Sequence, residues 1–243
     1  LNSRYKFNYT PNTKKFKNEP LSFKNRFIIH LVCLIPIILG FLIPVLFIIN
    51  NVIYEFSRID FIKVFNLTTN TVIISLIATL IILVIAVYFQ FLKRILKNRT
   101  ITFFNEVISL TYALPGAVIG LSLILLFTSY PFENELLIGS FGILVYAYVI
   151  RYMAVGISPL KSSFDKHPSS YDDTAFNLGM GPTKLFRSIH LPINKSAIAI
   201  AFLITFVDII KELPITLILR PFNFDTLAVQ TYEYAIEEMI PKS

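Results

Sequence analysis

Residues 169–193, SSYDDTAFNLGMGPTKLFRSIHLPI, form a polar stretch between two strongly apolar runs of the chain. Ser169 or Ser170 can cap a short helix, because a serine hydroxyl accepts hydrogen bonds from the free amides of a first turn. Asp172 and Asp173 would then lie in that turn, where carboxylates suit the positive end of the helix dipole. The stretch therefore predicts a short helix that begins beside these serines.

A second short helix is predicted over about residues 183–190. Gly179 and Gly181 allow a left-handed or sharply turned exit from the first helix, and Pro182 suits the first position of the second. Leu191-Pro192 would end the second helix, because proline lacks an amide donor and clashes with the preceding turn. Its side chains divide between an apolar face and a polar face: Leu185, Phe186 and Ile189 against Lys184, Arg187 and Ser188. A helix–turn–helix of this kind between membrane spans offers a compact protrusion to a soluble protein.

The composition indicates a membrane-embedded chain. Of the 243 residues, 55% are hydrophobic and 15% are charged, and the mean hydropathy is +0.66. An average soluble domain has about 25% charged residues. The net charge of +7 lies in short segments that flank apolar runs, a pattern that reports membrane topology, whereas nucleic-acid binding requires a continuous basic face. The single cysteine, Cys33, excludes an intramolecular disulfide.

The apolar runs predict an all-α, polytopic helix bundle with five spans, at about residues 27–49, 71–92, 107–127, 136–156 and 196–214. Segment 93–99 carries four positive charges and no acid. The positive-inside rule places it in the cytoplasm, together with the N-terminus and a central loop at 158–194. Glu133 and Glu135 then lie in a loop on the outside.

The two ends of the chain are polar. Residues 1–26 carry seven basic side chains against Glu19, and we expect a cytoplasmic arm or a linker, followed by a transmembrane domain over 27–243. Because the first residue is Leu1, we also expect the chain to be a piece of a longer protein. Residues 230–243 are too polar and too few to cross a membrane, so a sixth span is not evident.

The fifth run is marginal as an isolated span. One aspartate at the centre of a span opposes insertion by about 2.5–3.5 kcal/mol, whereas each strongly apolar residue contributes only about −0.3 to −0.6 kcal/mol. Asp208, Lys211 and Glu212 share one helix face, since they stand at i, i+3 and i+4. We expect this face to meet the bundle interior or a watery pathway. An internal Asp208–Lys211 ion pair and a role in a pathway both remain open.

The central loop resembles the EAA loop of ABC-transporter permease subunits. That pattern reads E-A-A, three residues, G, nine residues, I-x-L-P. Here Asp173-Thr174-Ala175 stand in place of E-A-A, Gly179 is the glycine, and Ile189-x-Leu191-Pro192 ends the pattern in register. Asp replaces Glu, and Thr replaces the first Ala. The alternative is an ordinary amphipathic loop between two spans.

Two further strings carry the same resemblance. Residues 112–121, YALPGAVIGL, resemble a signature of permeases for ferric iron, sulfate, molybdate and polyamines. Residues 211–228, KELPITLILRPFNFDTLA, resemble the second half of ferric-iron-type permeases, in which two homologous halves are fused. The resemblance implies a type I ABC importer permease in a bacterial inner membrane. Ferric iron is the implied solute, with sulfate, thiamine, phosphonate or polyamine as alternatives.

The resemblance also implies partners and site residues. The partners are a cytoplasmic ABC ATPase dimer that holds ATP and Mg²⁺, an extracytoplasmic solute-binding protein, a second permease half and membrane lipid. Contact with the ATPase is expected at Asp172, Asp173, Thr174, Ala175, Gly179, Lys184, Leu185, Phe186, Arg187, Ile189, Leu191 and Pro192. A translocation pathway is expected at Pro115, Gly116, Asp208, Glu212 and Arg220.

No catalytic residue, metal ligand or cofactor is expected in this chain. The sequence has no Walker A motif and no catalytic-triad spacing, and His30, His167 and His190 are scattered. Two other classes remain as alternatives. An integral-membrane enzyme could use Asp208 and Glu212 as a carboxylate pair, because they lie at i and i+4. A passive scaffold would account for the spans but not for the motif in the loop.

Overall fold

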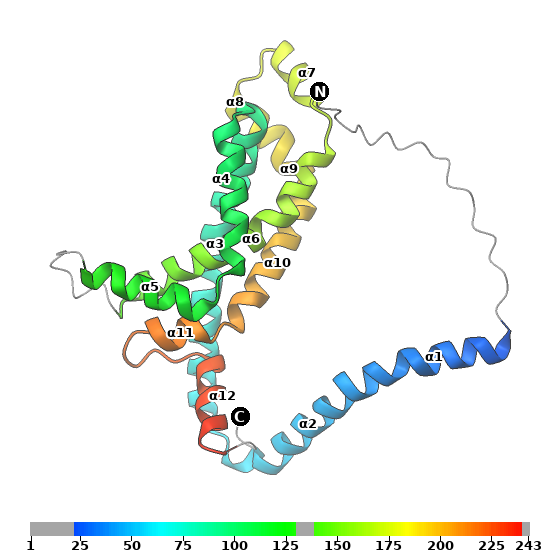
Figure 1. Cartoon of the computed structure of the whole chain (residues 1–243), viewed down its shortest axis with the longest axis vertical. Helices are drawn as coiled ribbons and strands as arrows, with labels where there is room; N and C mark the ends of the chain where they lie inside the picture. The colour runs from blue at the N-terminus through cyan, green and yellow to red at the C-terminus, as the bar shows by residue number, and fades with distance from the viewer. Residues whose placement is uncertain (1–21, 130–138, 240–243) are drawn as a thin grey trace. The chain divides into compact units, whose positions relative to one another are not determined.

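The computed structural model describes residues 22–129 and 139–239, and within these ranges it contains helices and no strand (Figure 1). The all-α prediction is therefore confirmed. The chain divides into two units, residues 1–56 and 57–243. Most of the predicted basic arm, together with Glu133 and Glu135, lies outside the described residues.

The described part of the first unit is one nearly continuous apolar helix. It consists of α1 (Phe23–Ile37), the π-helical turn η1 (Ile38–Leu42) and α2 (Ile43–Glu55). With the 3₁₀ turn Phe56–Arg58 it is long and apolar enough to cross a membrane. The predicted first span is thus extended at both ends. Pro44 follows the π-helical turn by two residues, and the wider turn accommodates the missing amide donor.

The second unit has a core of three helices: α3 (Phe61–Leu96), α6 (Phe141–Lys166) and α10 (Lys195–Ile210). Small residues bring these helices close together. A Cβ atom on Gly156 of α6 would lie 2.6 Å from Cγ2 of Ile82 on α3, so only glycine fits there without displacement. Ala78, Ala86 and Ala201 are fully buried in the same core. Such close backbone approach is typical of membrane helix packing.

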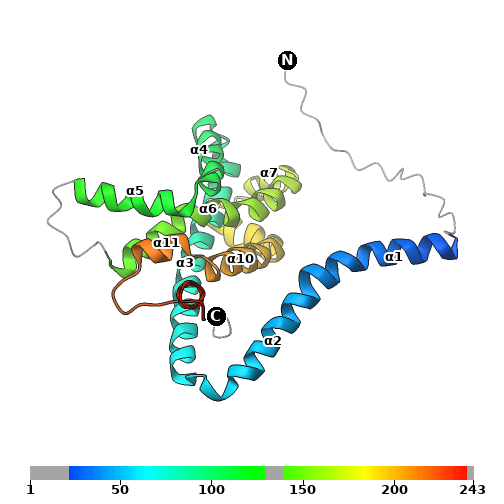
Figure 2. The same ribbon diagram turned by 60° about the horizontal axis from the view of Figure 1, so that its bottom comes forward.

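The predicted third span is broken. It comprises α4 (Arg99–Leu110), the 3₁₀ turn Thr111–Ala113 and α5 (Gly116–Ser129), and the helix axis turns by 109° at the break. Leu114 is extended, with φ −75° and ψ 131°, as the steric demand of the following proline requires. Over 107–127 the structure therefore has two helices, which form one candidate span if the bent pair is counted together. In both views α5 projects from the bundle (Figures 1 and 2).

The predicted fourth span begins and ends later than expected. Residues 136–138 lie outside the described ranges, and α6 starts at Phe141 after the cap Ser140, whose Oγ accepts the Ile143 amide at 3.3 Å. The helix continues through Pro159 to Lys166. Residues 158–166 are therefore the last turns of α6, and the central loop starts at His167 instead of residue 158.

The predicted fifth span is also interrupted. Helix α10 ends at Ile210, and α11 (Pro214–Leu219) starts after a corner at Lys211–Leu213, where proline can begin a helix but not continue one. The ten-residue α12 (Leu227–Ile236) is too short to span a membrane, as predicted for the C-terminal residues. Among the described residues, three helices can cross a membrane, or up to five if each bent pair counts as one span.

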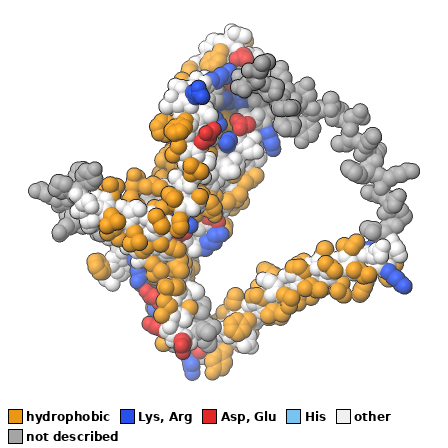
Figure 3. Space-filling view, in the orientation of Figure 1, with side chains coloured by type: hydrophobic (Ala, Val, Ile, Leu, Met, Phe, Trp, Pro, Cys, Tyr) orange, Lys and Arg blue, Asp and Glu red, His pale blue; other side chains and the backbone are white. Residues whose placement is uncertain are grey.

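Charged side chains gather at the two ends of the second unit on the face shown in Figure 3. One group surrounds α7 and α8, and another lies where α3 begins; between them the surface is largely hydrophobic, apart from a smaller charged group near the end of α10. This distribution fits a bundle whose middle lies in hydrocarbon and whose ends lie in water.

Candidate functional site: the loop between α6 and α10

The loop that joins α6 to α10, residues 167–194, contains two short helical segments. The first is α7 (Ser170–Asn177), with Asp172 and Asp173 in its first turn. Ser169 occupies the cap position, but its side chain makes no capping hydrogen bond. The second segment comprises α8 (Pro182–Leu185), the π-helical turn η5 (Phe186–His190) and α9 (Leu191–Ile193).

Gly179 makes the turn between the two segments. Its φ is +73°, a conformation that glycine adopts without steric cost. The amide of Met180 donates to the Ala175 carbonyl at 3.0 Å, and the amide of Gly179 donates to the Phe176 carbonyl at 2.9 Å. These two bonds form a Schellman motif, which ends α7. Gly181 has φ −72°, which any residue can adopt, so the left-handed position is Gly179 alone.

The second segment does not end at Leu191-Pro192, contrary to the sequence prediction. It continues to Ile193 because the π-helical turn ends two residues before Pro192. In a regular α-helix the proline ring would clash with the Ser188 carbonyl and lack its own hydrogen bond. The π-helical turn widens the backbone at that point. Asn194 then separates this segment from α10.

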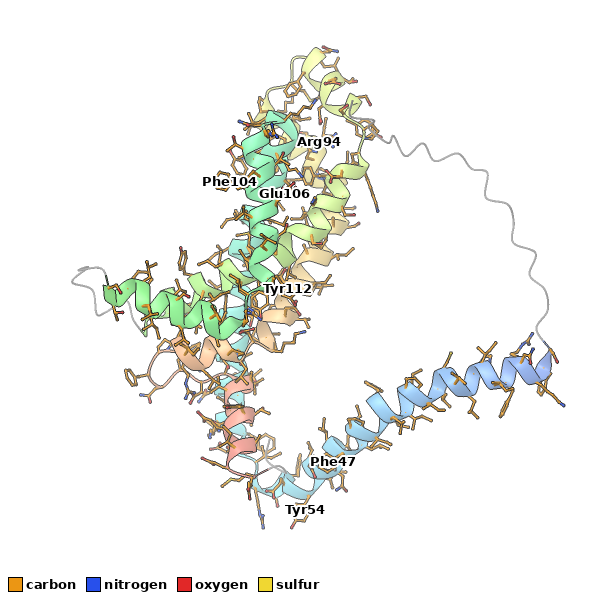
Figure 4. The ribbon with its side chains drawn as sticks, viewed as in Figure 1. Phe47, Tyr54, Arg94, Phe104, Glu106 and Tyr112 are labelled. Atoms are coloured by element: carbon orange, nitrogen blue, oxygen red, sulfur yellow. The ribbon has the colours of Figure 1, made fainter. Side chains whose placement is uncertain are left out.

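Arg94, at the end of α3, holds the start of the loop. Its Nε donates to Oδ2 of Asp172 at 2.6 Å. Its Nη1 donates to the carbonyls of Phe164 at 2.7 Å and His167 at 3.0 Å, and its Nη2 to that of Pro168 at 2.8 Å. One guanidinium thus joins α3, the end of α6 and α7. Figure 4 labels Arg94 at this end of the bundle.

His190 connects the second helical segment to the same carboxylate. Its Nε2 lies 2.8 Å from Oδ1 of Asp172, and its ring stacks on Phe164 with centroids 5.5 Å apart. Burial lowers the pKa of His190, and the hydrogen bond and charge of Asp172 oppose that shift without reversing it. The neutral ring therefore donates Nε2–H to Asp172 near neutral pH. We call Arg94, Asp172 and His190 the loop clamp.

An apolar cluster under the clamp seats the loop on the bundle. Phe91 of α3, Phe164 of α6, Ala175 of α7 and Leu185 of α8 form it. Leu185 is 0% exposed and Asp172 is 6% exposed. The prediction that Leu185 contacts a soluble partner directly is therefore wrong, because its side chain is used inside the chain.

The remaining predicted contact residues lie nearer the surface. Exposed positions are Asp173, Thr174, Gly179, Lys184, Arg187 and Pro192, and partly buried ones are Phe186, Ile189 and Leu191. The sequence prediction missed two apolar side chains on the outer surface, Phe176 and Leu178, which are 41% and 74% exposed. Exposed apolar side chains beside a turn are typical of contact surfaces.

The predicted pathway residues separate into three places. Gly116 and Glu212 meet: a Cβ atom on Gly116 would lie 2.7 Å from Oε1 of Glu212. Pro115 stands at the adjoining break. Asp208 instead pairs with Lys211 at 2.8 Å. Arg220 pairs with Asp225 and, at 2.8 Å, with Glu233.

Glu212 lies in a buried polar group. Its carboxylate accepts hydrogen bonds from Tyr152 Oη and from the amide of Ile215, the latter at 3.2 Å. Arg151 Nε lies 3.5 Å from Oε2 of Glu212, and Arg151 Nη1 donates to the Leu114 carbonyl at 2.7 Å. Both α6 residues were missed by the sequence prediction. A charged residue within an apolar run, as at Arg151, was the available signal.

Asp208 faces a different space. With Ser109, Tyr112, Ser158 and Lys161 it lines a cavity of about 490 Å³ between α4, α6 and α10. Figure 4 labels Tyr112 at the corner between α4 and α5. Asp208 and Glu212 thus have separate partners. In the described ranges, no group of three or more His, Cys, Asp or Glu side chains could hold a metal ion.

No family model matches the sequence. The chain is similar to the Fe(3+)-transport system permease protein FbpB 2 of Haemophilus influenzae, with 26% identity over 175 residues, which cover 72% of this chain and 34% of the relative. It is also similar to the maltose/maltodextrin transport system permease protein MalG of Escherichia coli K12, with 32% identity over 94 residues, or 38% of this chain and 31% of the relative. MalG of Photorhabdus laumondii is 31% identical over 94 residues.

The matched region spans about a third of the length of these relatives. The relatives are transport permeases, which agrees with the helical bundle and its candidate spans. The chain is therefore similar to permease proteins of transport systems, in agreement with the motifs of its sequence.

Proposed function

We propose that this chain is a membrane-spanning permease subunit of an ATP-driven importer in a bacterial inner membrane, with its N-terminus in the cytoplasm. The observation that carries the proposal is loop 167–194, which the loop clamp holds against both α3 and α6. A rigidly seated loop can transmit a push from a soluble protein to the helices on either side of it, whereas a mobile loop would absorb the push.

The soluble protein in this proposal is a cytoplasmic ABC ATPase dimer, on which ATP and Mg²⁺ are bound. Phe176 and Leu178 offer apolar contact, and Lys184 and Arg187 offer polar contact, since all four side chains are exposed. Asp172 and Leu185 support this surface from inside. A solute-binding protein and a second permease half complete the importer, and the apolar outer surface contacts membrane lipid.

Ferric iron is the proposed solute. The similarity to FbpB 2 extends over 72% of the chain, and the similarity to MalG over 38%. The shorter match supports a second candidate, in which the same permease role serves another small solute, such as a sugar. Sulfate, thiamine, phosphonate and polyamine remain alternatives from the sequence motifs.

Uptake of labelled ferric iron in cells that express the intact gene tests this proposal. Gly179→Arg forces a side chain into the left-handed turn of the loop. Gly139→Arg is its matched control, because Gly139 also has a positive φ, +77°, open space around it, and a place beside the other end of α6. Protein levels in the membrane are compared by blot.

We expect Gly179→Arg to abolish uptake at an unchanged protein level, while Gly139→Arg retains it. Equal uptake in wild type and Gly179→Arg would refute the role of the loop. If wild type, Gly179→Arg and Gly139→Arg all show no uptake, ferric iron is excluded as the solute. The same comparison would then use maltose, sulfate, thiamine, phosphonate and polyamines.

A further inference from the structure

The two broken helices of the second unit meet at one buried polar group, which we call the corner node: Gly116, Arg151, Tyr152 and Glu212. Arg151 binds the carbonyl of Leu114, directly before the α4–α5 break. Glu212 lies in the α10–α11 corner and accepts the amide of Ile215. Beyond the node, α5 and α11 pack closely, since a Cβ atom on Gly120 would lie 3.2 Å from Ile218 Cγ2. The node therefore joins both corners to α6.

The corner node is also connected to loop 167–194 from both sides. Helix α6 carries Arg151 and Tyr152 and runs directly into the loop, and α10 leaves the loop and ends beside Glu212. Continuous helices can carry displacement along their axes, and α6 and α10 are continuous over 26 and 16 residues, with Pro159 in α6 between the node and the loop. Any movement of the loop that shifts α6 relative to α10 must therefore change the distance between Arg151 and Glu212.

The ion pair at the node is costly and incompletely formed. Glu212 is buried and Arg151 is partly buried. Charged groups inside a membrane bundle stabilise the fold little compared with apolar side chains, so they often mark a function. Arg151 Nε is 3.5 Å from Glu212 Oε2 and has no hydrogen-bond partner within the described residues. A small displacement would close this contact and a larger one would open it.

Gly116 leaves just enough space for the pair. A Cβ atom there would lie 2.7 Å from Glu212 Oε1 and 3.1 Å from Arg151 Nη1. Alanine at this position would therefore push the two charged groups without changing either charge. The Gly116→Ala variant therefore tests the geometry of the node without altering its charges.

We propose that Arg151 and Glu212 are positioning residues that pass the movement of loop 167–194 to α5 and α11, and that Glu212 is not a ligand of the transported solute. The expected effect on transport rests on the proposed function. The mechanical connection between the helices does not, because it lies within this chain. Two experiments separate them.

The first experiment measures the connection in the full chain, in lipid nanodiscs and without any partner. With Cys33 replaced by serine, spin labels at the exposed positions Leu125 on α5 and Val207 on α10 report the distance between these helices. We expect Gly116→Ala, Glu212→Gln and the double variant Arg151→Gln/Glu212→Gln to broaden or shift the distance distribution. Matched controls are Gly142→Ala, whose Cβ would meet nothing closer than 3.7 Å, and the exposed Glu237→Gln. A wild-type distribution in all three node variants would overturn the proposal.

The second experiment measures ferric-iron uptake and ATP hydrolysis in membrane vesicles that contain the complete transporter. Loss of coupling predicts that Glu212→Gln reduces uptake by about tenfold or more while hydrolysis changes by less than about twofold. Uptake by the double variant Arg151→Gln/Glu212→Gln should be no lower than uptake by the less active of the two single variants, because the effects of residues that act as a unit are not additive. A solute ligand would instead show an increased half-saturating iron concentration at unchanged coupling, and that result would refute the positioning role. If wild-type vesicles show no ATP-driven uptake, the proposed function fails, while the distance measurement still decides the connection.

Discussion

Replacement of Arg94 by glutamine should release loop 167–194 from the bundle. Arg94 makes four hydrogen bonds, one to the Asp172 carboxylate and three to backbone carbonyls. The two side chains of the ion pair are 12% and 8% exposed. Removal of one partner of a buried pair costs about 3–5 kcal/mol. Because this pair lies at the edge of the bundle, near water, we take the lower limit, about 3 kcal/mol, for the local stability of the loop.

Amide hydrogen exchange of the full chain in nanodiscs measures this local stability. A loss of about 3 kcal/mol predicts that the amides of α7 exchange about 10²-fold faster, while those of the α3 and α6 core keep their protection. Arg94→Lys should give an intermediate effect, because an ammonium keeps the charge but cannot reach all the carbonyls. The matched control is Arg187→Gln in the same loop, since Arg187 is exposed. If α7 exchanges at the wild-type rate in Arg94→Gln, the clamp does not hold the loop.

Three further predictions concern the loop and the core. Burial lowers the pKa of His190 below its ordinary 6.5, so the folded loop binds fewer protons than the unfolded loop. The exchange protection of α7 should therefore be full above pH 6.5 and fall as the pH drops below it. The His190→Gln variant should lose most of this pH dependence. His167 contributes with the same sign, because burial and the charges of Arg94 and Lys166 lower its pKa, and His167→Gln separates the two. Gly179→Ala should weaken the loop by about 1–2 kcal/mol in the same assay, because its φ of +73° is strained for alanine, whereas Gly181→Ala at φ −72° should not. Gly156→Ala should lower thermal stability by about 1–3 kcal/mol through its clash with Ile82. If the double variant Gly156→Ala/Ile82→Ala loses as much stability as the two single variants added together, the clash is not the cause.

Local signals in the sequence predicted the parts of the fold that depend on neighbouring residues. Apolar runs predicted the spans, and Gly179 and Pro182 predicted the turn between two short helices. The exact course of the backbone at prolines was harder to predict. Pro115 lies at the break between two helices that are bent by 109°, whereas Pro192 lies inside a continuous segment. A π-helical turn precedes Pro192, but Pro159 lies inside the continuous helix α6 without one, so the local sequence does not decide which proline breaks a helix.

The candidate site was predicted less completely because its contacts are distant in sequence. Arg94 was interpreted only as one of the positive charges that set topology, and its partner Asp172 is 78 residues away. Asp172 and Leu185 were expected on the outside because helical periodicity separates faces without saying which face is buried. Glu212 and Gly116 were singled out separately, and only the packing of two broken helices shows that they touch.

The π-helical turn Phe186–His190 is, in effect, one extra residue inserted into the second segment of the loop. Each residue rotates an α-helix by about 100°. Deletion of any one of these five residues would restore a regular helix, and the residues after it would keep nearly the same orientation, because the wider turn holds the extra residue without a full step of about 100°. Pro192 would then meet the carbonyl four residues before it, which the wider turn now avoids. The extra residue of the wide turn is thus what lets the helical path continue past Pro192 to Ile193.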